Sequence, residues 1–164
     1  MKLLIVRHAA AVPSGTQGIA DDDRPLTPKG AAKFRAAAKG LSRIARRPDV
    51  LLTSPLPRAR ATAEIAARAF KRVTPTDEPA LAHGGVEGIL KALGERPAEE
   101  TVAIVGHEPT LSALLAKLLG AADAERLAFK KGGAALVDLP QGPEGGGQLI
   151  WFLKPKILRR LGGN

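Results

Sequence analysis

An apolar run that ends in two polar residues lies at positions 3–8 and reads Leu3-Leu4-Ile5-Val6-Arg7-His8. Its apolar and β-branched residues predict a strand. Outward from this stretch, similar short runs alternate with helical patterns along the chain, which is typical of a parallel or mixed α/β sheet. Since 164 residues is the usual length of one domain, we expect a single α/β domain over residues 1–164.

Six strands are expected from these runs, at Leu3–Arg7, Asp49–Thr53, Arg72–Thr74, Thr101–Val105, Ala134–Leu139 and Leu149–Leu153. The Pro and Gly residues of segment 140–147 predict a hairpin loop between the last two strands. That glycine run has no following Lys-Ser/Thr, so it is not a P-loop. Amphipathic helices are expected over Pro28–Arg47, with a basic outer face, over Pro57–Phe70 and after Pro109.

Composition excludes several classes of protein. The chain has no cysteine, which excludes disulfides, thiolate nucleophiles and cysteine-bound metals. No stretch approaches the roughly 18 apolar residues of a membrane span, and we expect a cytoplasmic protein. The net charge of +9 suggests an anionic partner. Only five aromatic residues are present and none is tyrosine, which argues against stacking platforms for single-stranded nucleic acid.

Polar residues follow three of the expected strands. Arg7 and His8 end the first, Ser54 to Arg58 follow the second, and Gly106-His107-Glu108-Pro109 follows the fourth. Ligands of open α/β sheets bind outside the carboxyl ends of the strands. We therefore expect two histidines and two arginines to converge at one place.

Arg58 lies on the inward face of its helix, together with Ala61, Thr62 and Ile65. An arginine at such a position needs an anion or a carboxylate, because a buried unpaired charge is very costly. The residue types leave two interpretations open. Arg58 binds an anionic ligand, or it pairs with a structural carboxylate such as Asp49.

The three histidines differ in their sequence context. His107 precedes Pro109 at a helix start, where the helix dipole favours a neutral imidazole and attracts anions, although a packed or capping histidine is an equal alternative. His83 is expected in a loop. With no carboxylates at ligand spacing, the three histidines make a poor metal site.

Four motifs occur in order along nearly the whole chain. They read Arg7-His8-Ala9, Arg24-Pro25-Leu26-Thr27-Pro28-Lys29-Gly30, Ser54-Pro55-x-x-Arg58-Ala59-x-x-Thr62-Ala63 and Gly106-His107-Glu108-Pro109. This set resembles the histidine phosphatase superfamily, and most closely its SixA-type phosphohistidine phosphatases. The resemblance implies a phosphoglycerate mutase-like fold, a three-layer domain with a central, mostly parallel sheet and helices on both faces.

The resemblance also implies a role for each residue of the site. His8 is the nucleophile that takes the phosphoryl group, and water then hydrolyses the phosphohistidine. Arg7 and Arg58 clamp the equatorial oxygens, because guanidinium groups suit phosphate geometry. His107 hydrogen-bonds the phosphoryl group from the other side, and Arg24 is an additional phosphate-binding residue. No metal or other cofactor is expected.

One departure from the family bears on the substrate. Larger relatives such as the phosphoglycerate mutases carry a glutamate that acts as general acid, and the corresponding stretch here, 78–85, shows no matching acid. Glu87 stays open as an alternative acid. An imidazole leaves with less help than an alkoxide, since its conjugate acid has a pKa of about 6.5. The missing acid therefore favours a phosphoramidate, and together with the resemblance this implies phosphohistidine on a signalling protein as the substrate.

Two other functions are weighed against this one. One is a small-molecule phosphomonoesterase of the same superfamily, and the other is a module that binds nucleic acid or acidic proteins through the basic helix 29–47. The excess charge lies in residues 24–72, which hold 13 basic and two acidic residues. We interpret it as a basic flank that draws a phosphoprotein towards the site. We expect no nucleic-acid or membrane partner, and residues 151–161 are expected to be a last strand with a packed basic tail.

Overall fold

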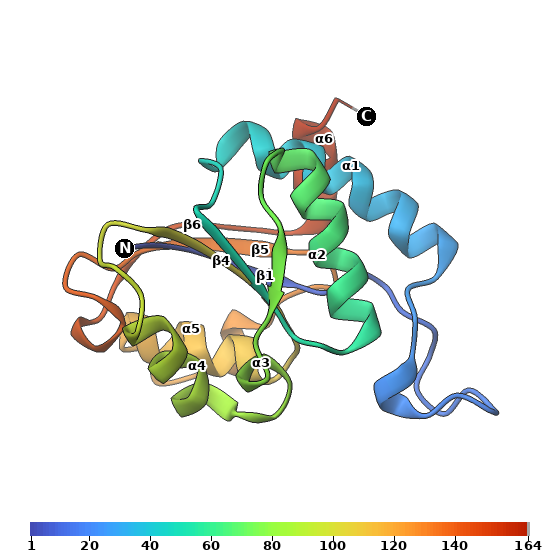
Figure 1. Cartoon of the computed structure of the whole chain (residues 1–164), viewed down its shortest axis with the longest axis horizontal. Coiled ribbons are helices and arrows are strands. Elements are labelled where there is room, and N and C mark those ends of the chain that lie inside the picture. The colour runs from blue at the N-terminus through green and yellow to red at the C-terminus, as the bar shows by residue number, and fades with distance from the viewer. Residues whose placement is uncertain (164) are drawn as a thin grey trace.

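A twisted sheet of six strands forms the centre of the computed structural model, which describes residues 1–163 (Figure 1). The strands are β1 (Lys2–Arg7), β2 (Val50–Thr53), β3 (Pro75–Asp77), β4 (Thr101–Gly106), β5 (Ala134–Asp138) and β6 (Gln148–Leu153). Their order in the sheet is β3-β2-β4-β1-β5-β6. The first four strands run parallel, while β5 and β6 are antiparallel to their neighbours. The predicted α/β class with a mostly parallel sheet is confirmed.

Helices cover both faces of this sheet (Figure 1). One face carries α1 (Pro28–Ile44), α2 (Pro57–Phe70) and α6 (Pro155–Leu161). The other carries α3 (Ala80–His83), α4 (Gly85–Gly94) and α5 (Thr110–Leu119). Three short 3-10 helices lie in connections, η1 (Asp21–Asp23), η2 (Glu125–Leu127) and η3 (Pro143–Gly145). No helix within residues 1–163 combines the length and the apolar character needed to cross a bilayer.

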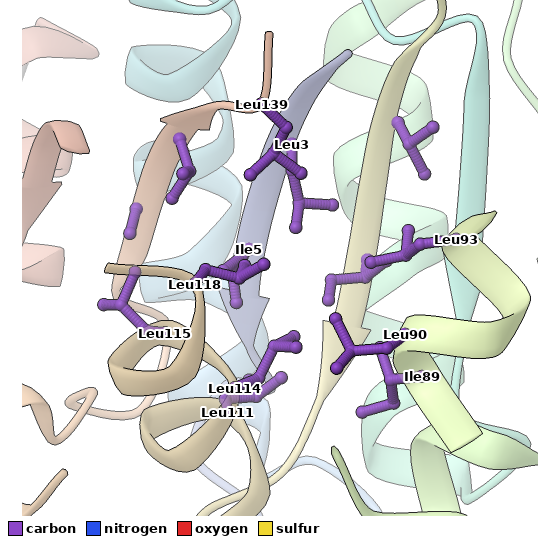
Figure 2. Close-up of a cluster of buried hydrophobic side chains, with 14 of the residues drawn as sticks. Leu3, Ile5, Ile89, Leu90, Leu93, Leu111, Leu114, Leu115, Leu118 and Leu139 are labelled. Carbon is purple, nitrogen blue, oxygen red and sulfur yellow. The ribbon is translucent and has the colours of Figure 1, made fainter. Parts of the chain in front are cut away.

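The core consists of two layers, one on each face of the sheet, and β1 contributes side chains to both. Leu3 and Ile5 point to one face, where they pack with the leucines of α4 and α5 (Figure 2). Leu4 and Val6 point to the opposite face, into a cluster that includes residues of α1, α2 and α6. Because successive side chains of a strand point to opposite faces, an unbroken apolar run is what a strand covered on both sides requires. Helices packed on both faces hold β1 in place, and they therefore position Arg7 and His8 at its carboxyl end.

Helix α6 packs closely against α1, which brings the end of the chain back to the first helix. A Cβ atom at Gly40 would lie only 1.8 Å from the carbonyl oxygen of Leu158. The absence of a side chain at Gly40 therefore allows the two helix backbones to approach. The tail after β6 was expected to be packed, and the structure shows that it is helical.

Three element boundaries differ from the predictions. The strand predicted at Arg72–Thr74 is wrong. Lys71 and Arg72 have φ values of 58° and 52°, so they form the turn that ends α2, and β3 begins only at Pro75. Helix α1 ends at Ile44 rather than Arg47, because Ala45 is already extended as the chain turns towards Pro48 and β2. His83 is the last residue of α3 and not part of a loop.

Candidate active site

The carboxyl ends of β1, β2 and β4 lie next to one another at one edge of the sheet. In the register of the parallel strands, Arg7 pairs with Gly106 and Thr53 pairs with Val105. The residues that follow these strands therefore share one place. The rings of His8 and His107 lie with their centroids 5.0 Å apart and their planes tilted by 53°.

His8 is buried and neutral. The residue is only 5% exposed, and its Nδ1 lies 2.7 Å from the carbonyl oxygen of Ala9. Since a carbonyl only accepts hydrogen bonds, Nδ1 carries the ring proton and Nε2 keeps its lone pair. Burial lowers the pKa of His8 to about 3, and the nearby His107 and Arg58 contribute in the same direction. At neutral pH the ring is a neutral imidazole held in one tautomer, with the lone pair on Nε2.

Two backbone contacts hold the segment that carries His8. The Ala9 N–H donates to the hydroxyl of Thr62 at 3.0 Å, and that hydroxyl donates to the carbonyl of Arg58 at 2.7 Å. On the other side, the Gly132 N–H donates to the carbonyl oxygens of Arg7 and His8, at 3.1 and 3.0 Å. The sequence places Thr62 in a motif and on the inward face of its helix, but it does not predict this hydrogen bond. A hydroxyl on that otherwise apolar face was the signal of its role.

Arg58 is buried at the start of α2, as its helical phase predicts, with an exposure of 5%. Its Nη1 donates to the carbonyl oxygen of Asp21 at 2.9 Å, and its Nη2 lies 3.9 Å from the Asp21 carboxylate. The alternative partner Asp49 is wrong, because its carboxylate accepts from the Thr101 N–H at 2.9 Å. Burial lowers the pKa of Arg58, and the neighbouring Arg24 lowers it further.

Arg7 is held through the segment that precedes β5. Its Nη1 donates to the carbonyl oxygen of Phe129. The N–H of the same residue, Phe129, donates to the carboxylate of Glu108 at 3.1 Å, and the Ser112 hydroxyl donates to that carboxylate at 2.6 Å. Burial lowers the pKa of Arg7, whereas the charge of Glu108 raises it. Glu108, whose role its motif did not indicate, therefore supports Arg7 through the backbone of Phe129.

His107 contacts Ser54, the residue that follows β2. Its Nε2 lies 2.8 Å from the Ser54 hydroxyl oxygen, which also accepts the Leu56 N–H at 3.2 Å. The remaining hydrogen of that hydroxyl is suited to His107 Nε2, and this arrangement places the ring proton on Nδ1. Burial lowers the pKa of His107 to about 4, and Arg58 adds to the effect. His107 thus presents a neutral imidazole.

Unpartnered buried nitrogens gather at this site. Within residues 1–163, four buried side-chain polar atoms have no hydrogen-bond partner, and three of them are Arg7 Nε, Arg58 Nε and His107 Nδ1. Buried polar groups are normally satisfied, because an unpaired one costs about 1–3 kcal/mol. Three such nitrogens beside one neutral histidine are explained by an anion that accepts several hydrogen bonds.

Arg24 lies at the rim of the same site. Its Nε is 2.9 Å from the carboxylate of Asp21, and its Nη1 donates to the carbonyl oxygen of Val12 at 2.9 Å. Its charge lowers the pKa of both Arg58 and His107, so it lies near them. The structure thus brings together all five predicted residues, with Arg24 tied to the loop that also holds Arg58.

Two glutamates in and near the stretch 78–85 have partners outside the four motifs. Glu78 accepts the N–H of Ala80 at 3.0 Å, next to its own position. Glu87 forms an ion pair with Lys117 of α5 at 2.7 Å. Over the described part of the chain, residues 1–163, no three His, Asp or Glu side chains are grouped in a way that could hold a metal ion.

Comparison with known proteins identifies the family and the relatives that this chain matches. The model of the histidine phosphatase superfamily (branch 1) matches residues 3–88. An uncharacterised protein of Picosynechococcus is 34% identical over 136 residues, which cover 81% of this chain and 82% of the relative.

Solved structures with the same fold include two SixA proteins. SixA of Agrobacterium tumefaciens is 28% identical with a TM-score of 0.80, over 94% of this chain and 97% of that one. The protein histidine phosphatase SixA in complex with tungstate is 26% identical with a TM-score of 0.83, over 96% and 99% of the two chains. The α-ribazole phosphatase of Shigella flexneri, 19% identical with a TM-score of 0.73 over 94% and 97%, shares the fold.

Proposed function

The chain belongs to branch 1 of the histidine phosphatase superfamily and is of the SixA type, and we propose that it removes the phosphoryl group from phosphohistidine on a protein. The observation that carries this proposal is the cluster of three unpartnered buried nitrogens beside a neutral His8. A phosphoryl group supplies the acceptor oxygens that these nitrogens lack. The tungstate bound to one SixA neighbour, also an oxyanion, is consistent with this ligand class.

In the first step, Nε2 of His8 attacks the phosphorus atom in line with the bond to the substrate imidazole. A P–N bond to His8 forms as the P–N bond of the substrate breaks. The substrate ring leaves as neutral imidazole once its distal nitrogen holds a proton from water. Since His8 is neutral at all pH values well above about 3, no proton has to be removed before the attack.

In the second step, water attacks the phosphorus of phosphorylated His8. The new P–N bond breaks, its electron pair returns to Nε2, and inorganic phosphate leaves with the water oxygen. The proton released from water passes to solvent. His8 returns to its starting tautomer, because its Nδ1–H remains bonded to the carbonyl of Ala9 throughout.

Arg7, Arg58 and His107 stabilise the charge on the three equatorial oxygens. The guanidinium groups stay protonated despite their burial, and their planar N–H groups match phosphate oxygens. His107 donates from Nδ1, provided that Ser54 donates to its Nε2. Fixed donors in a buried site act more strongly on developing charge than water does.

The leaving group decides between phosphohistidine and ordinary phosphate esters. An alkoxide needs a proton from an acid, and both Glu78 and Glu87 are engaged elsewhere. A protonated phosphoimidazole needs none. The site is therefore better suited to a phosphoramidate than to a sugar or serine phosphate.

A substrate panel tests the proposal. Wild-type protein, His8→Asn and His83→Asn are assayed with a chemically phosphorylated histidine peptide, a phosphoserine peptide and a sugar phosphate, with a chelator present. We expect hydrolysis of the phosphohistidine peptide to dominate, to vanish in His8→Asn and to persist in His83→Asn. Rapid quenching should trap an acid-labile phosphate on His8. A preference for the sugar phosphate, or full activity of His8→Asn, would contradict the proposal.

A further inference from the structure

Two basic hollows flank the segment 129–133, which connects η2 to β5. The first hollow has a volume of about 50 Å³ and is lined by Lys33, Phe34, Lys131 and Arg159, among others. The second has a volume of about 260 Å³ and is lined by Arg126, Lys130, Phe152 and Lys154, among others. Consecutive lysines thus turn to opposite sides of one segment, and each joins two further cations and a phenylalanine.

Two other residues of this segment, Phe129 and Gly132, contact Arg7 and His8. Gly132, next to Lys131, donates its N–H to the carbonyl oxygens of Arg7 and His8. Phe129, next to Lys130, accepts from Arg7 through its carbonyl. Ala9, which follows His8, lines the first hollow itself. The first hollow therefore includes the residue that directly follows His8, and Lys131 lines the same hollow.

Within residues 1–163, five of the six cations of the two hollows form no ion pair, and the sixth, Arg126, pairs with Asp123 at 2.9 Å. Lys33, Lys130, Lys131 and Lys154 are exposed, and within residues 1–163 neither they nor Arg159 form an ion pair. No carboxylate lines either hollow.

The opposite side of the site has the opposite charge. Asp21, Asp22 and Asp23 form η1, whose backbone carbonyls hold Arg58. The rim around the two histidines is therefore positive along the β5–β6 side and negative along η1. Such a charge pattern orients a charged macromolecule, whereas a small phosphate ester fills only the centre.

We propose that the two basic hollows are a docking surface for acidic residues that flank the phosphohistidine of a substrate protein. This inference rests on the proposed function and specifies which phosphoproteins the site accepts. The surface differs from the basic flank 24–72 suggested by the sequence, because five of its six cations lie after residue 125 and come together only in the fold. Carboxylates in the hollows would pair with lysines beside the nucleophile and hold the phosphoryl group over His8.

Nucleic acid is the other polyanion that such lysines could attract, and the structure favours a protein. Phe34, in the first hollow, is only 2% exposed, and Phe152 in the second is packed against Phe129 with ring centroids 4.6 Å apart. Phe34 therefore presents no free ring face, and Phe152 alone is not a row of rings on which successive bases could stack. The nucleic-acid alternative therefore becomes an outcome of the test.

The test uses two phosphohistidine peptides of equal length, one with Asp and Glu around the histidine and one with Ser and Gln. They are assayed with wild-type protein, with K130E/K131E and with the control R46E/R47E. The control makes the same change in net charge at exposed positions just beyond the end of α1. Free phosphohistidine, which reaches only the centre of the site, reports whether the chemistry is intact.

We expect wild-type protein to have roughly 10-fold higher kcat/KM for the acidic peptide, mainly through KM and less so at high salt. K130E/K131E should lose this preference and keep its activity on free phosphohistidine, while R46E/R47E should retain the preference. Equal kcat/KM for both peptides, or an equal loss in the two variants, would overturn the docking surface and leave the proposed function standing. Hydrolysis of no phosphohistidine compound would overturn both. A duplex DNA that binds wild-type protein but not K130E/K131E, with no peptide preference, would assign the lysines to nucleic acid.

Discussion

The low pKa of His8 has a consequence for stability that can be measured without any substrate. An unfolded histidine titrates near 6.5, whereas burial lowers the pKa of folded His8 to about 3. Between these two values the unfolded chain binds a proton that the folded chain does not bind. Acid therefore favours unfolding, and the contribution of His8 to the free energy of unfolding falls as the pH falls from about 6.5 towards 3.

The size of the effect follows from the two pKa values. At about pH 4.5 an unfolded His8 lies two pH units below its pKa, while the folded residue is still neutral. The penalty relative to neutral pH is then about 2.7 kcal/mol, since one pKa unit corresponds to about 1.4 kcal/mol. This is a large share of the roughly 5–15 kcal/mol that stabilises a typical domain.

Denaturant unfolding followed by the fluorescence of Trp151, the single tryptophan, measures this difference. We compare wild-type protein with His8→Asn at neutral pH and at about pH 4.5, and use the exposed His83→Asn as a control. Asp21 and Asp138, whose pKa values are lowered by their partners, contribute equally to all three proteins and cancel. His8→Asn should lose about 2.7 kcal/mol less than wild-type protein on acidification. If it loses as much as wild-type protein, His8 is not held neutral by burial.

Three further predictions concern activity and packing. Arg58→Lys should lower kcat/KM roughly 100-fold, because an ammonium cannot replace the planar guanidinium, and a rate within a factor of three of wild type would contradict a contact with the phosphoryl group. Thr62→Val leaves the Ala9 N–H unpaired and should lower kcat roughly 10-fold with little change in KM, Thr62→Ser should restore it, and failure of that rescue would argue against the hydrogen bond. Gly40→Ala places a Cβ atom 1.8 Å from the Leu158 carbonyl oxygen and should reduce the free energy of unfolding by about 3 kcal/mol. The control Gly94→Ala, whose Cβ atom would have no atom within 4 Å, should change it by less than about 1 kcal/mol. Equal effects of the two substitutions would refute the close packing of α1 and α6.

Local patterns were sufficient for most of the architecture. The apolar run before Arg7 and His8 predicted β1, since a strand covered on both faces needs unbroken apolar side chains. The helical phase of Arg58 predicted that it would be buried, because a period of 3.6 residues places it among the residues that face the sheet. Both conclusions depend only on near neighbours in the sequence.

The ends of helices and strands could be predicted less well, because they depend on backbone turns and contacts that form only in the folded chain. The strand expected at Arg72–Thr74 is displaced by a turn at Lys71 and Arg72, whose left-handed backbone no propensity of these residues indicates. The chain after β6 forms helix α6, which packs on α1 where Gly40 has no side chain to block the contact. This contact joins two segments more than 100 residues apart.

The sequence by itself determined which residues meet at the candidate site, because motif spacing and periodicity place Arg7, His8, Arg58 and His107 at the ends of strands and the start of a helix. Only the tertiary structure decided their states and partners. The pKa of His8 depends on burial by segments far apart in the chain. The backbone contact of Arg58 comes from Asp21, 37 positions away, and the Gly132 N–H that contacts the His8 carbonyl comes from a segment more than 100 residues after it. Charge and desolvation act through space, so they become defined only when the chain has folded.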